Sequence, residues 1–580
     1  MPRYVQSSPA LPDVYESDRM LQSWLGRLLG SDGLGAAEGR LKALAAEVMG
    51  PLRAAHQQAE AHPPTLHRYD GWGHRVDRVE VSEGWERLRV AAAEHGLVGL
   101  PYGAEARERW GAKARVVQFA LLHLYGPESA TFTCPVAMAD GAAALLSLPD
   151  VDGGIRDAWL PRLISTDPSV TITSGQWMTE SQGGSDVGRS TTAALPAADG
   201  SWRITGEKWF CSAIDSPMAV ALARPHGAGM HSPARASSEG SKGLAPFLIP
   251  RYAADSPLAG VTAGPNDPAP GVKLHRLKDK LGTRAVPTAE VGLTDAYALP
   301  LGEPEGGLAR MMTLVVVTRL HNAVAAAGGM RRGLAYARAY ADVRGVSGGR
   351  LSANPLHRTT LATLAVDAQA AFALAAYAFD LLGRVEVDDD PQARRELRIV
   401  APLAKLTTGK LAVASASEYL ESFGGAGYVE DTGIPRMLRD AQVLPIWEGT
   451  TNVLAVDVVR ALAHDKELGQ LFLSKLDAAT EQASGMLIGG AVDGLRAARF
   501  ALMDLLPAAA ADPRDDAVLA GARHMALIMG YALALALLVE HAAATNDEAT
   551  KVACELWGRA RLTADETAVD AHRTFDILCG

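Results

Sequence analysis

The sequence predicts a multidomain α+β protein with four parts: an N-terminal α-helical domain, a middle β domain, a C-terminal four-helix bundle and an additional C-terminal α-helical domain. A chain of 580 residues is too long for a single hydrophobic core. Apolar residues recur at helical spacing near both ends, whereas short β-prone runs separated by Gly, Asn, Asp and Pro lie between them. We place the domains at residues 1–166, 167–300, 301–464 and 465–580.

The first domain carries helical periodicity in four segments, and a connection with two prolines, residues 62–70, is expected to be extended. The helical segments are 21–29, 36–55, 84–95 and 107–123.

The middle domain carries five short β-prone runs, and its Gly/Ser/Pro-rich piece 225–241 is expected to be an exposed loop. The runs are 170–173, 201–205, 218–222, 246–249 and 289–293.

The bundle is predicted from alanine-rich helical segments, because small side chains allow helices to pack closely. These segments are 311–343, 361–382, 394–420 and 452–463. The strongly apolar run 525–539 is shorter than the roughly 18 residues that a spanning helix needs, so we expect a buried core helix and no membrane span.

Composition excludes several classes of protein. The formal net charge of −10 argues against a basic nucleic-acid-binding surface over the whole chain. Four cysteines without a CxxC pattern, and 15 histidines without paired-ligand spacing, predict neither a disulfide framework nor a metal site. The start of the chain shows no apolar signal region, so we expect a reduced, cytoplasmic setting.

The stretch 444–452, LPIWEGTTN, places the carboxylate of Glu448 between an apolar run and a glycine. Apolar neighbours remove solvation from a carboxylate and make it a stronger base. Thr450 or Thr451 is expected to cap the helix that follows, whose dipole opposes this effect by favouring the anion. A Glu before a helix cap is more often structural than catalytic, so this stretch needs support from elsewhere in the chain.

That support comes from three further stretches in order: MTESQGGSDV at 178–187, GEKWFCS at 206–212, and ESFGGAGY at 421–428 followed by RMLRD at 436–440. Together with IWEGT they resemble the acyl-CoA dehydrogenase family of flavoenzymes over roughly residues 85–463. The resemblance implies an FAD cofactor and α,β-dehydrogenation of an acyl thioester such as an acyl-CoA. Because a flavin needs small residues and hydroxyls near its phosphates and ring edge, Met178, Thr179, Gly184 and Ser185 suit the cofactor.

The resemblance assigns the remaining site residues. Trp209 and Ser212 match the positions that pack on the isoalloxazine ring and contact it, and Thr450 and Asn452 are also expected at the cofactor. Arg344 lies 25 residues after Arg319 and matches the arginine that reaches the FAD of a neighbouring subunit. Residues matching the adenosine contact across a dimer interface are Glu421, Gly424 and Gly425, so the resemblance implies a homo-oligomer, at least a dimer and expected to be a tetramer.

The expected substrate contacts are Ser185, Arg319, Glu448 and Gly449. The backbone N–H of Glu448 would donate to the thioester carbonyl. The Glu448 carboxylate would remove the α-proton while flavin N5 takes a hydride from the β-carbon. Some family branches carry the base directly before the first arginine, and Thr318 occupies that position here. Glu448 therefore has no visible rival.

Several features resemble the alkylation-response, AidB-type, branch of the family: the Pro-Pro connection, Cys134-Pro135, the RLKDKLGTR run at 276–284, Trp447, and the extra C-terminal block. Two residues depart from the family pattern. Val316 replaces an Asp that contacts CoA, and Ser347 replaces an aromatic residue at the adenine pocket, so the thioester carrier and the adenine contact stay open.

The charge of the C-terminal block argues against DNA binding. Residues 461–580 carry 10 Lys and Arg against 17 Asp and Glu, a net of −7, whereas duplex DNA needs cationic contacts to phosphate. A small basic patch around Arg496 and Arg499, or Arg559 and Arg561, stays possible. Two alternatives to an acyl-CoA dehydrogenase remain: an AidB-like flavoprotein with a protective or binding role, and a desaturase or oxidase acting on a carrier-protein thioester. The electron acceptor is either an electron-transfer flavoprotein or oxygen.

Overall fold

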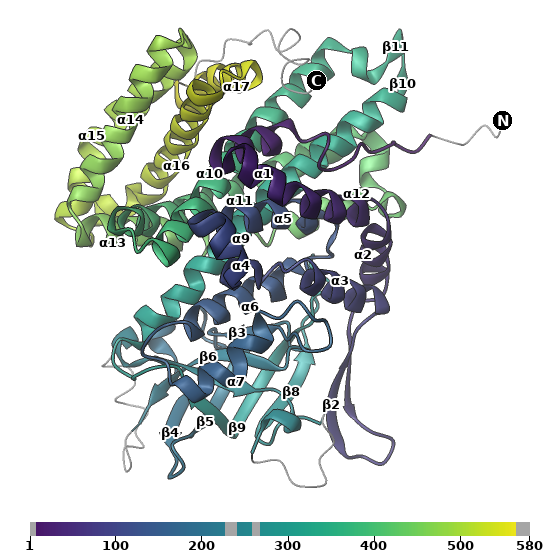
Figure 1. Ribbon diagram of the computed structural model, residues 1–580, viewed down its shortest axis with the longest axis vertical. Helices are drawn as coiled ribbons and strands as arrows, with labels where there is room; N and C mark the ends of the chain where they lie inside the picture. The colour runs from purple at the N-terminus through teal and green to yellow at the C-terminus, as the bar shows by residue number, and fades with distance from the viewer. Residues whose placement is uncertain (1–6, 227–239, 258–266, 564–580) are drawn as a thin grey trace. The chain divides into compact units, whose positions relative to one another are not determined.

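The structure is a computed structural model that describes residues 7–226, 240–257 and 267–563. The chain divides into two compact units (Figure 1). The first contains Met1–Met49, Glu105–Pro127 and Asn322–Gly580, and the second contains Gly50–Ala104 and Glu128–His321.

The second unit begins with two helices, the second of which matches the helix predicted at 84–95, and with a hairpin that the sequence did not predict. Helix α2 (Pro51–Ala61) packs against α3 (Glu83–Glu94) so closely that a Cβ on Gly84 would lie 2.2 Å from the carbonyl oxygen of Ala55. The connection expected to be extended contributes β1 (Thr65–Tyr69), which pairs antiparallel with β2 (Arg75–Glu80). Further helices of this unit are α6 (Thr133–Leu146) and α7 (Gly153–Leu163).

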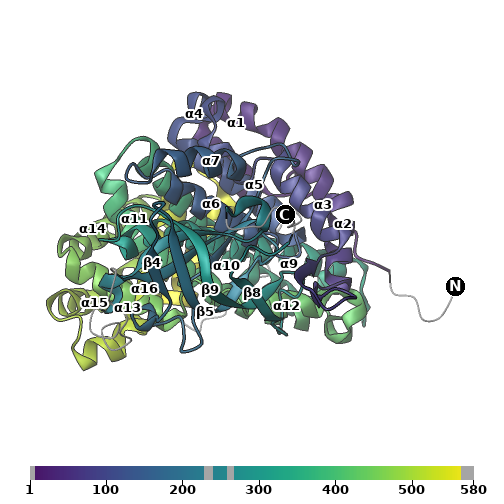
Figure 2. The same ribbon diagram turned by 90° about the horizontal axis from the view of Figure 1, so that it is seen from below.

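The middle domain is a closed sheet. Strand β6 (Met218–Pro225) pairs with β4 (Ala193–Pro196) on one side and with β7 (Ala245–Pro250) on the other. The ring is completed by pairs of β4 with β5, β5 with β9 and β9 with β7, and Figure 2 shows β4, β5, β9 and β8 side by side. The other strands are β3 (Ser174–Trp177), β5 (Trp202–Ser212), β8 (Val272–Leu277) and β9 (Thr288–Pro300). Buried side chains from these strands fill one core.

The strand predicted at 170–173 is wrong. The carbonyl oxygen of Asp167 accepts hydrogen bonds from the backbone N–H of Val170 and Thr171, which holds the segment in a turn. Strand β3 begins four residues later, in a run of low β-propensity, because Ser174 pairs in parallel with Met218 of β6. The loop predicted at 225–241 falls mostly on residues 227–239, which lie outside the described residues.

The predicted bundle forms from α9 (Gly307–Val343), α10 (Pro355–Val387), α11 (Pro391–Ser422) and α13 (Thr451–His464). Asparagine and aspartate cap two of these helices: Asn354 accepts from the first turn of α10, and Asp390 does so for α11. The first unit also contains α1 (Arg19–Met49), α4 (Ala104–Trp110), α5 (Ala114–Tyr125) and α12 (Ile434–Ala441).

Two predicted N-terminal helices have different boundaries. The segment 36–55 is divided because α1 ends at Met49 and Pro51 starts α2. The segment 107–123 is broken at Gly111, whose φ of 52° interrupts the helix between α4 and α5.

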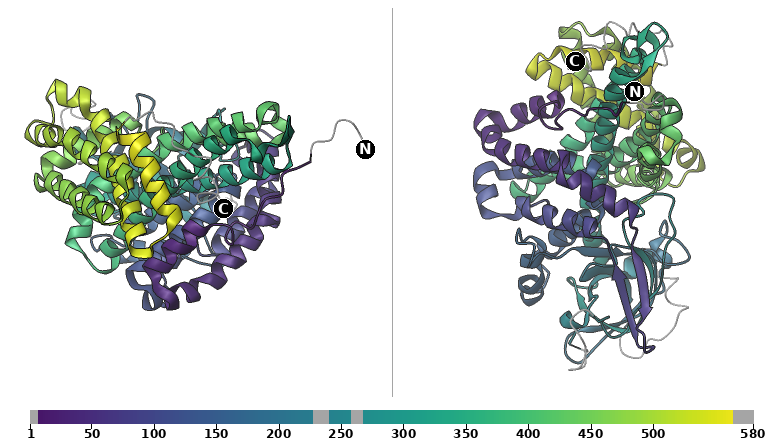
Figure 3. Two further views of the ribbon diagram at one scale, coloured as in Figure 1. Left: turned by 90° about the horizontal axis from the view of Figure 1, so that it is seen from above. Right: turned by 90° about the vertical axis from the view of Figure 1, so that its right-hand side faces the viewer.

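The additional C-terminal block consists of α14 (Glu467–Gly485), α15 (Gly489–Ala511), α16 (Asp516–Thr545) and α17 (Glu548–Gly558). Helix α16 packs along α10, α11 and α13. Figure 3 shows the yellow-green C-terminal helices beside the teal and green helices of the bundle. A Cβ on Gly530 would lie 1.9 Å from Oγ1 of Thr407, so the two backbones approach closely. The prediction of a buried core helix at 525–539 is confirmed.

By length and composition, α9, α10 and α16 could each cross a membrane. Between 78% and 83% of the apolar window of each helix is buried inside the structure, which is the environment of a core helix.

Candidate functional site: a carboxylate turn, a glycine-rich loop and a pocket at the bundle

The glycine-rich loop after β3 is built around one buried carboxylate. Glu180 accepts hydrogen bonds from the backbone N–H groups of Thr191 and Thr192 at 2.8 and 3.1 Å, and from both threonine hydroxyls. Nζ of the fully buried Lys208 lies 3.0 Å from the same carboxylate. Burial alone would raise the pKa of Glu180, but Lys208 and the threonine donors outweigh burial and hold that pKa at about 2. The ionised carboxylate therefore fixes both ends of the loop.

The same loop meets the tryptophan of β5. The backbone N–H of Trp209 donates to the carbonyl oxygen of Thr179 at 2.9 Å. Gly184 lies against the Thr179 side chain, since a Cβ there would be 2.5 Å from Oγ1. The structure thus brings Thr179, Gly184 and Trp209 together, as expected from the sequence.

One face of Trp209 is covered by a cation that the sequence did not indicate. Nζ of Lys278 lies 3.4 Å from the indole centroid and 2.6 Å from the carboxylate of Glu290. A cation over an indole face is attracted by the ring quadrupole and fixes the ring orientation. The indole is half-buried, so part of it remains open for a planar ligand.

Three more predicted positions lie near this loop in the chain. Met178 follows β3, and its sulfur accepts from the amide of Gln176 at 3.1 Å. Ser185 is exposed on the loop. Ser212 ends β5, where its hydroxyl is 3.1 Å from that of Thr288.

Helix α9 carries three positions that the sequence connects with the expected substrate. Thr318 is buried and donates from its hydroxyl to the carbonyl oxygen of Val315 at 3.1 Å. Arg319 is also buried, with 6% of its surface exposed. Val316 is half-buried and offers no polar atom where a CoA contact is expected.

Glu448 lies in a turn between α12 and α13 and adopts an unusual backbone conformation. Its φ is +56° and that of Gly449 is +101°, both in the left-handed region. The indole N–H of Trp447 donates to the side-chain oxygen of Asn322, and Nζ of Lys405 donates to the carbonyl oxygen of Gly449 at 2.6 Å. The half-buried carboxylate of Glu448 therefore projects from a turn that is held on both sides.

The helix after this turn begins as expected. The hydroxyl of Thr450 accepts from the backbone N–H of Val453 and makes Thr450 the N-cap of α13, whereas Thr451 is buried. Asn452 is exposed, and its side-chain oxygen accepts from Arg523 of α16 at 3.0 Å. The C-terminal block therefore contacts a residue expected at the cofactor.

A separate pocket of about 600 Å³ forms within the first unit, between the ends of α9 and α11 and the start of α10. Four predicted cofactor residues line it together: Arg344, Glu421, Gly424 and Gly425. Three other residues that line this pocket were not predicted from the sequence. Tyr340 stacks on Phe423 with centroids 4.6 Å apart, and Nε2 of His357 is buried with no hydrogen-bond partner among the described residues. Only helical spacing could have placed Tyr340 beside Arg344.

The stacked pair of Tyr340 and Phe423 bears on the serine found at position 347, where the family has an aromatic residue. Ser347 is exposed in the turn between β10 (Gly345–Val346) and β11 (Gly349–Arg350). Phe423 and Tyr340 supply aromatic surface in the pocket, so an aromatic residue at position 347 is not needed to line it.

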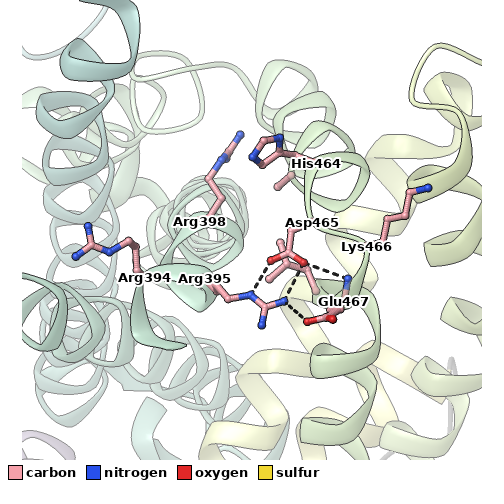
Figure 4. Close-up of a pocket in the computed structure, with 9 residues that line it drawn as sticks. Arg394, Arg395, Arg398, His464, Asp465, Lys466 and Glu467 are labelled. Atoms are coloured by element: carbon pink, nitrogen blue, oxygen red, sulfur yellow. Dashed lines mark hydrogen bonds and ion pairs between the residues drawn. The ribbon is translucent and has the colours of Figure 1, made fainter. Parts of the chain in front are cut away.

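A second pocket, of about 730 Å³, has an arginine-rich lining where α11 meets the connection between α13 and α14 (Figure 4). Figure 4 shows Arg395 directed at Asp465 and Glu467, with contacts of 2.7 and 2.8 Å. Arg398 pairs with Asp457 at 2.7 Å. Carboxylates thus pair with both Arg395 and Arg398 in this lining.

The predicted site residues are divided between the two units. The glycine-rich loop, Trp209, Ser212 and Arg319 belong to the second unit, whereas Arg344, Glu421 and the Glu448 turn belong to the first.

In comparisons with known proteins, three family models match this chain between residues 7 and 463. Family models match for the adaptive response protein AidB N-terminal domain at 7–168, the acyl-CoA dehydrogenase middle domain at 175–296, and the acyl-CoA dehydrogenase C-terminal domain at 305–463. The chain is 36% identical to acyl-CoA dehydrogenase family member 11 of Caenorhabditis elegans, over 93% of this chain and 86% of the relative. It is 31% identical to the putative acyl-CoA dehydrogenase AidB of Escherichia coli over 70% of each chain.

A solved structure extends the likeness to the whole fold. The crystal structure of Caenorhabditis elegans ACDH-11 in complex with C11-CoA matches with a TM-score of 0.87 and 34% identity. The match covers 97% of this chain and 93% of that one.

Proposed function

Because the chain belongs to the acyl-CoA dehydrogenase family, within its AidB-type branch, we propose that it catalyses the FAD-dependent α,β-dehydrogenation of a fatty acyl-CoA with Glu448 as the base. Members of the family bind FAD and are oxidoreductases that act on CH–CH donors. The relative from Caenorhabditis elegans has been crystallised with C11-CoA, which supports an acyl-CoA as the substrate class here.

The residues present fit the cofactor. The 600 Å³ pocket combines a stacked aromatic pair with Arg344, which suits an aromatic base carrying phosphates. In the second unit, Gly184 lets the glycine-rich loop pack against the Thr179 side chain, and Trp209 offers a half-buried indole to the ring. When bound, FAD supplies the hydride acceptor for the β-carbon.

Glu448 would then remove the proton from the α-carbon of the thioester. The α-proton is only weakly acidic, and its removal places negative charge on the carbonyl oxygen of the thioester. A backbone N–H aimed at this oxygen stabilises that charge, and we assign this donation to Glu448 itself. Departure of the α-proton to the carboxylate and of the β-hydrogen as hydride leaves an α,β-unsaturated thioester.

The observation that carries this proposal is the held turn: Glu448 has a strained left-handed backbone, and Trp447 and Gly449 are each tethered by a side chain from another helix. Such strain persists only where the surroundings impose it and is common at functional sites.

The test is anaerobic bleaching of the flavin absorbance by a series of acyl-CoAs of increasing length, for the wild type and for Glu448→Gln. We expect bleaching by at least one chain length, and a loss of at least 1000-fold in rate in the variant. Bleaching that survives in Glu448→Gln means that another group is the base. A protein that no acyl-CoA bleaches points to a carrier-protein thioester, which the apolar Val316 would suit.

A protective, DNA-binding role is the second candidate and has less support. Three of the four arginines that could form a basic patch are paired with carboxylates: Arg499 with Asp477, Arg559 with Glu555, and Arg561 with Asp367. Pairing removes the cations that duplex phosphates need. A salt-sensitive mobility shift with duplex DNA would revive this role.

We also propose that the protein is a homo-oligomer. The rim of the 600 Å³ pocket carries the exposed apolar side chain of Leu356, and Tyr428 is exposed just beyond Ala426 of the same pocket. A second copy over this face would cover both side chains. Light scattering at micromolar concentration distinguishes a tetramer from a monomer.

A further inference from the structure

The turn that carries Glu448 does not hold its conformation by itself. A residue other than glycine is disfavoured in the left-handed region, because Cβ crowds the following carbonyl oxygen. Glu448 and Gly449 both have positive φ, at 56° and 101°. A helical residue at 448 would point its carboxylate elsewhere, so the groups that impose the left-handed turn also decide where the base points.

Lys405 is the main one of these groups. It lies on α11, has no exposed surface, and donates from Nζ to the carbonyl oxygen of Gly449 at 2.6 Å. One turn further along α11, Gly409 fits directly against the start of the same segment, since a Cβ there would lie 3.0 Å from the carbonyl oxygen of Leu444. Helix α11 thus contacts the segment 444–449 at two points, Leu444 and Gly449.

The second tether comes from α9. The indole N–H of Trp447 donates to the side-chain oxygen of Asn322, and Asn322 is 4% exposed. The residues on both sides of Glu448 are therefore bound by side chains from two different helices.

A buried ammonium group is an energetically unfavourable choice of donor to a single carbonyl oxygen. Burying a charge costs far more free energy than burying a neutral donor, and a hydroxyl or amide could satisfy one carbonyl oxygen. What the charge adds is a shorter and stronger hydrogen bond. From the 2.6 Å contact and covalent geometry, Nζ lies at most ~9 Å from the Cα of Glu448. The cation thus lies within about 9 Å of the Cα that carries the predicted base.

We propose that Lys405 is a positioning residue for the dehydrogenation: its buried ammonium holds the Gly449 carbonyl, fixes the left-handed turn at Glu448 and so directs the carboxylate, with Asn322 acting as the second tether through Trp447. This inference rests on the proposed function, in which Glu448 is the base. It assigns to α11 a role in catalysis beyond the bundle core.

The test compares Lys405→Met, which keeps the length and apolar stem of the side chain, with Lys410→Met as the matched control. Lys410 lies on the same helix but is partly exposed. For each purified FAD-loaded variant we would measure flavin content, melting temperature, the Kd of a non-reactive acyl-CoA thioether, and the rate of anaerobic flavin bleaching per bound flavin at saturating acyl-CoA.

In Lys405→Met the bleaching rate per bound flavin should fall at least 30-fold, while the Kd of the thioether changes less than threefold. Hydrogen exchange of a peptide covering 444–452 should accelerate, because the turn has lost one tether. Lys410→Met should match the wild type in all of these measurements. A role in stability alone would lower the melting temperature and leave the rate per bound flavin unchanged.

A rate within threefold of the wild type in Lys405→Met, with Glu448→Gln inactive, overturns the positioning role and leaves the base assignment intact. Bleaching that survives in Glu448→Gln overturns the base assignment instead. If Lys405→Met does not fold, Trp447→Phe tests the other tether: we expect about a tenfold loss of rate with thioether affinity kept, and an unchanged rate refutes the tethered turn.

Discussion

His541 should make the attachment of the C-terminal block to the N-terminal helix sensitive to pH. It lies on α16 with no exposed surface, and its Nε2 is 3.0 Å from the hydroxyl of Ser23 on α1. Its ring stacks on Trp24 at 4.5 Å, and beside it Arg27 pairs with Glu540 at 2.9 Å. Burial, followed by the positive charge of Arg27, lowers the pKa of His541 from 6.5 to about 4.

The sign and size of the effect follow from this shift. The folded pKa is depressed, so the unfolded chain takes up a proton at higher pH than the folded protein does. Neutral His541 therefore contributes its full stability above pH 6.5, and the contribution is lost as pH falls towards 4. A shift of roughly 2.5 units at about 1.36 kcal/mol each gives a loss of about 3 kcal/mol.

The assay is urea unfolding of the wild type and His541→Gln between pH 4.5 and 7.5, followed by circular dichroism. Glutamine keeps a donor for Ser23 but does not titrate, so the variant should lack most of the wild-type slope in this range. His524→Gln, on an exposed part of the same helix, is the control and should keep that slope. Parallel stability curves for wild type and His541→Gln, within about 0.5 kcal/mol, would refute the reasoning.

Three other predictions follow from the contacts described. Glu180→Gln should lower the free energy of unfolding by about 3 kcal/mol at pH 7, since its pKa is about 2 against an ordinary 4.5; this contribution is complete above pH 4.5 and is lost as pH falls towards 2, which urea unfolding at several pH values would measure. Asp367→Asn should lower the free energy of unfolding by about 2 kcal/mol, because the half-buried Arg561 loses the carboxylate that lies 2.6 Å from it; replacing both residues by Leu and Met should restore most of the loss, as thermal unfolding would show. Arg344→Ala and His357→Ala should each weaken FAD retention about tenfold, because both line the pocket assigned to the cofactor; fluorescence of released FAD on dilution would measure this, and unchanged retention in both would move the cofactor elsewhere.

The family and the order of the domains could be predicted from the sequence, because short contiguous motifs indicate both. The runs at 178–187 and 446–450 are local, and the cap of α13 at Thr450 follows from residue type and position alone. Helical periodicity likewise located α9, α10 and α11 within a few residues. The assignment of Glu448 and of the cofactor residues remains a prediction that the experiments above address.

The contacts that hold these motifs could not be predicted from the sequence, because they join residues far apart in the chain. Lys208 lies 28 residues from Glu180, Lys405 lies 44 from Gly449, and Asp367 lies 194 from Arg561. A buried charge gives no local pattern in the chain, because its partner is chosen by which elements pack together. The same reason explains the strand predicted at 170–173: pairing with β6 selected Ser174–Trp177 over a run of higher β-propensity. For Glu448, the motif predicts a base, whereas the hydrogen bond from Lys405 on another helix to the neighbouring Gly449 is a contact that only the folded chain shows.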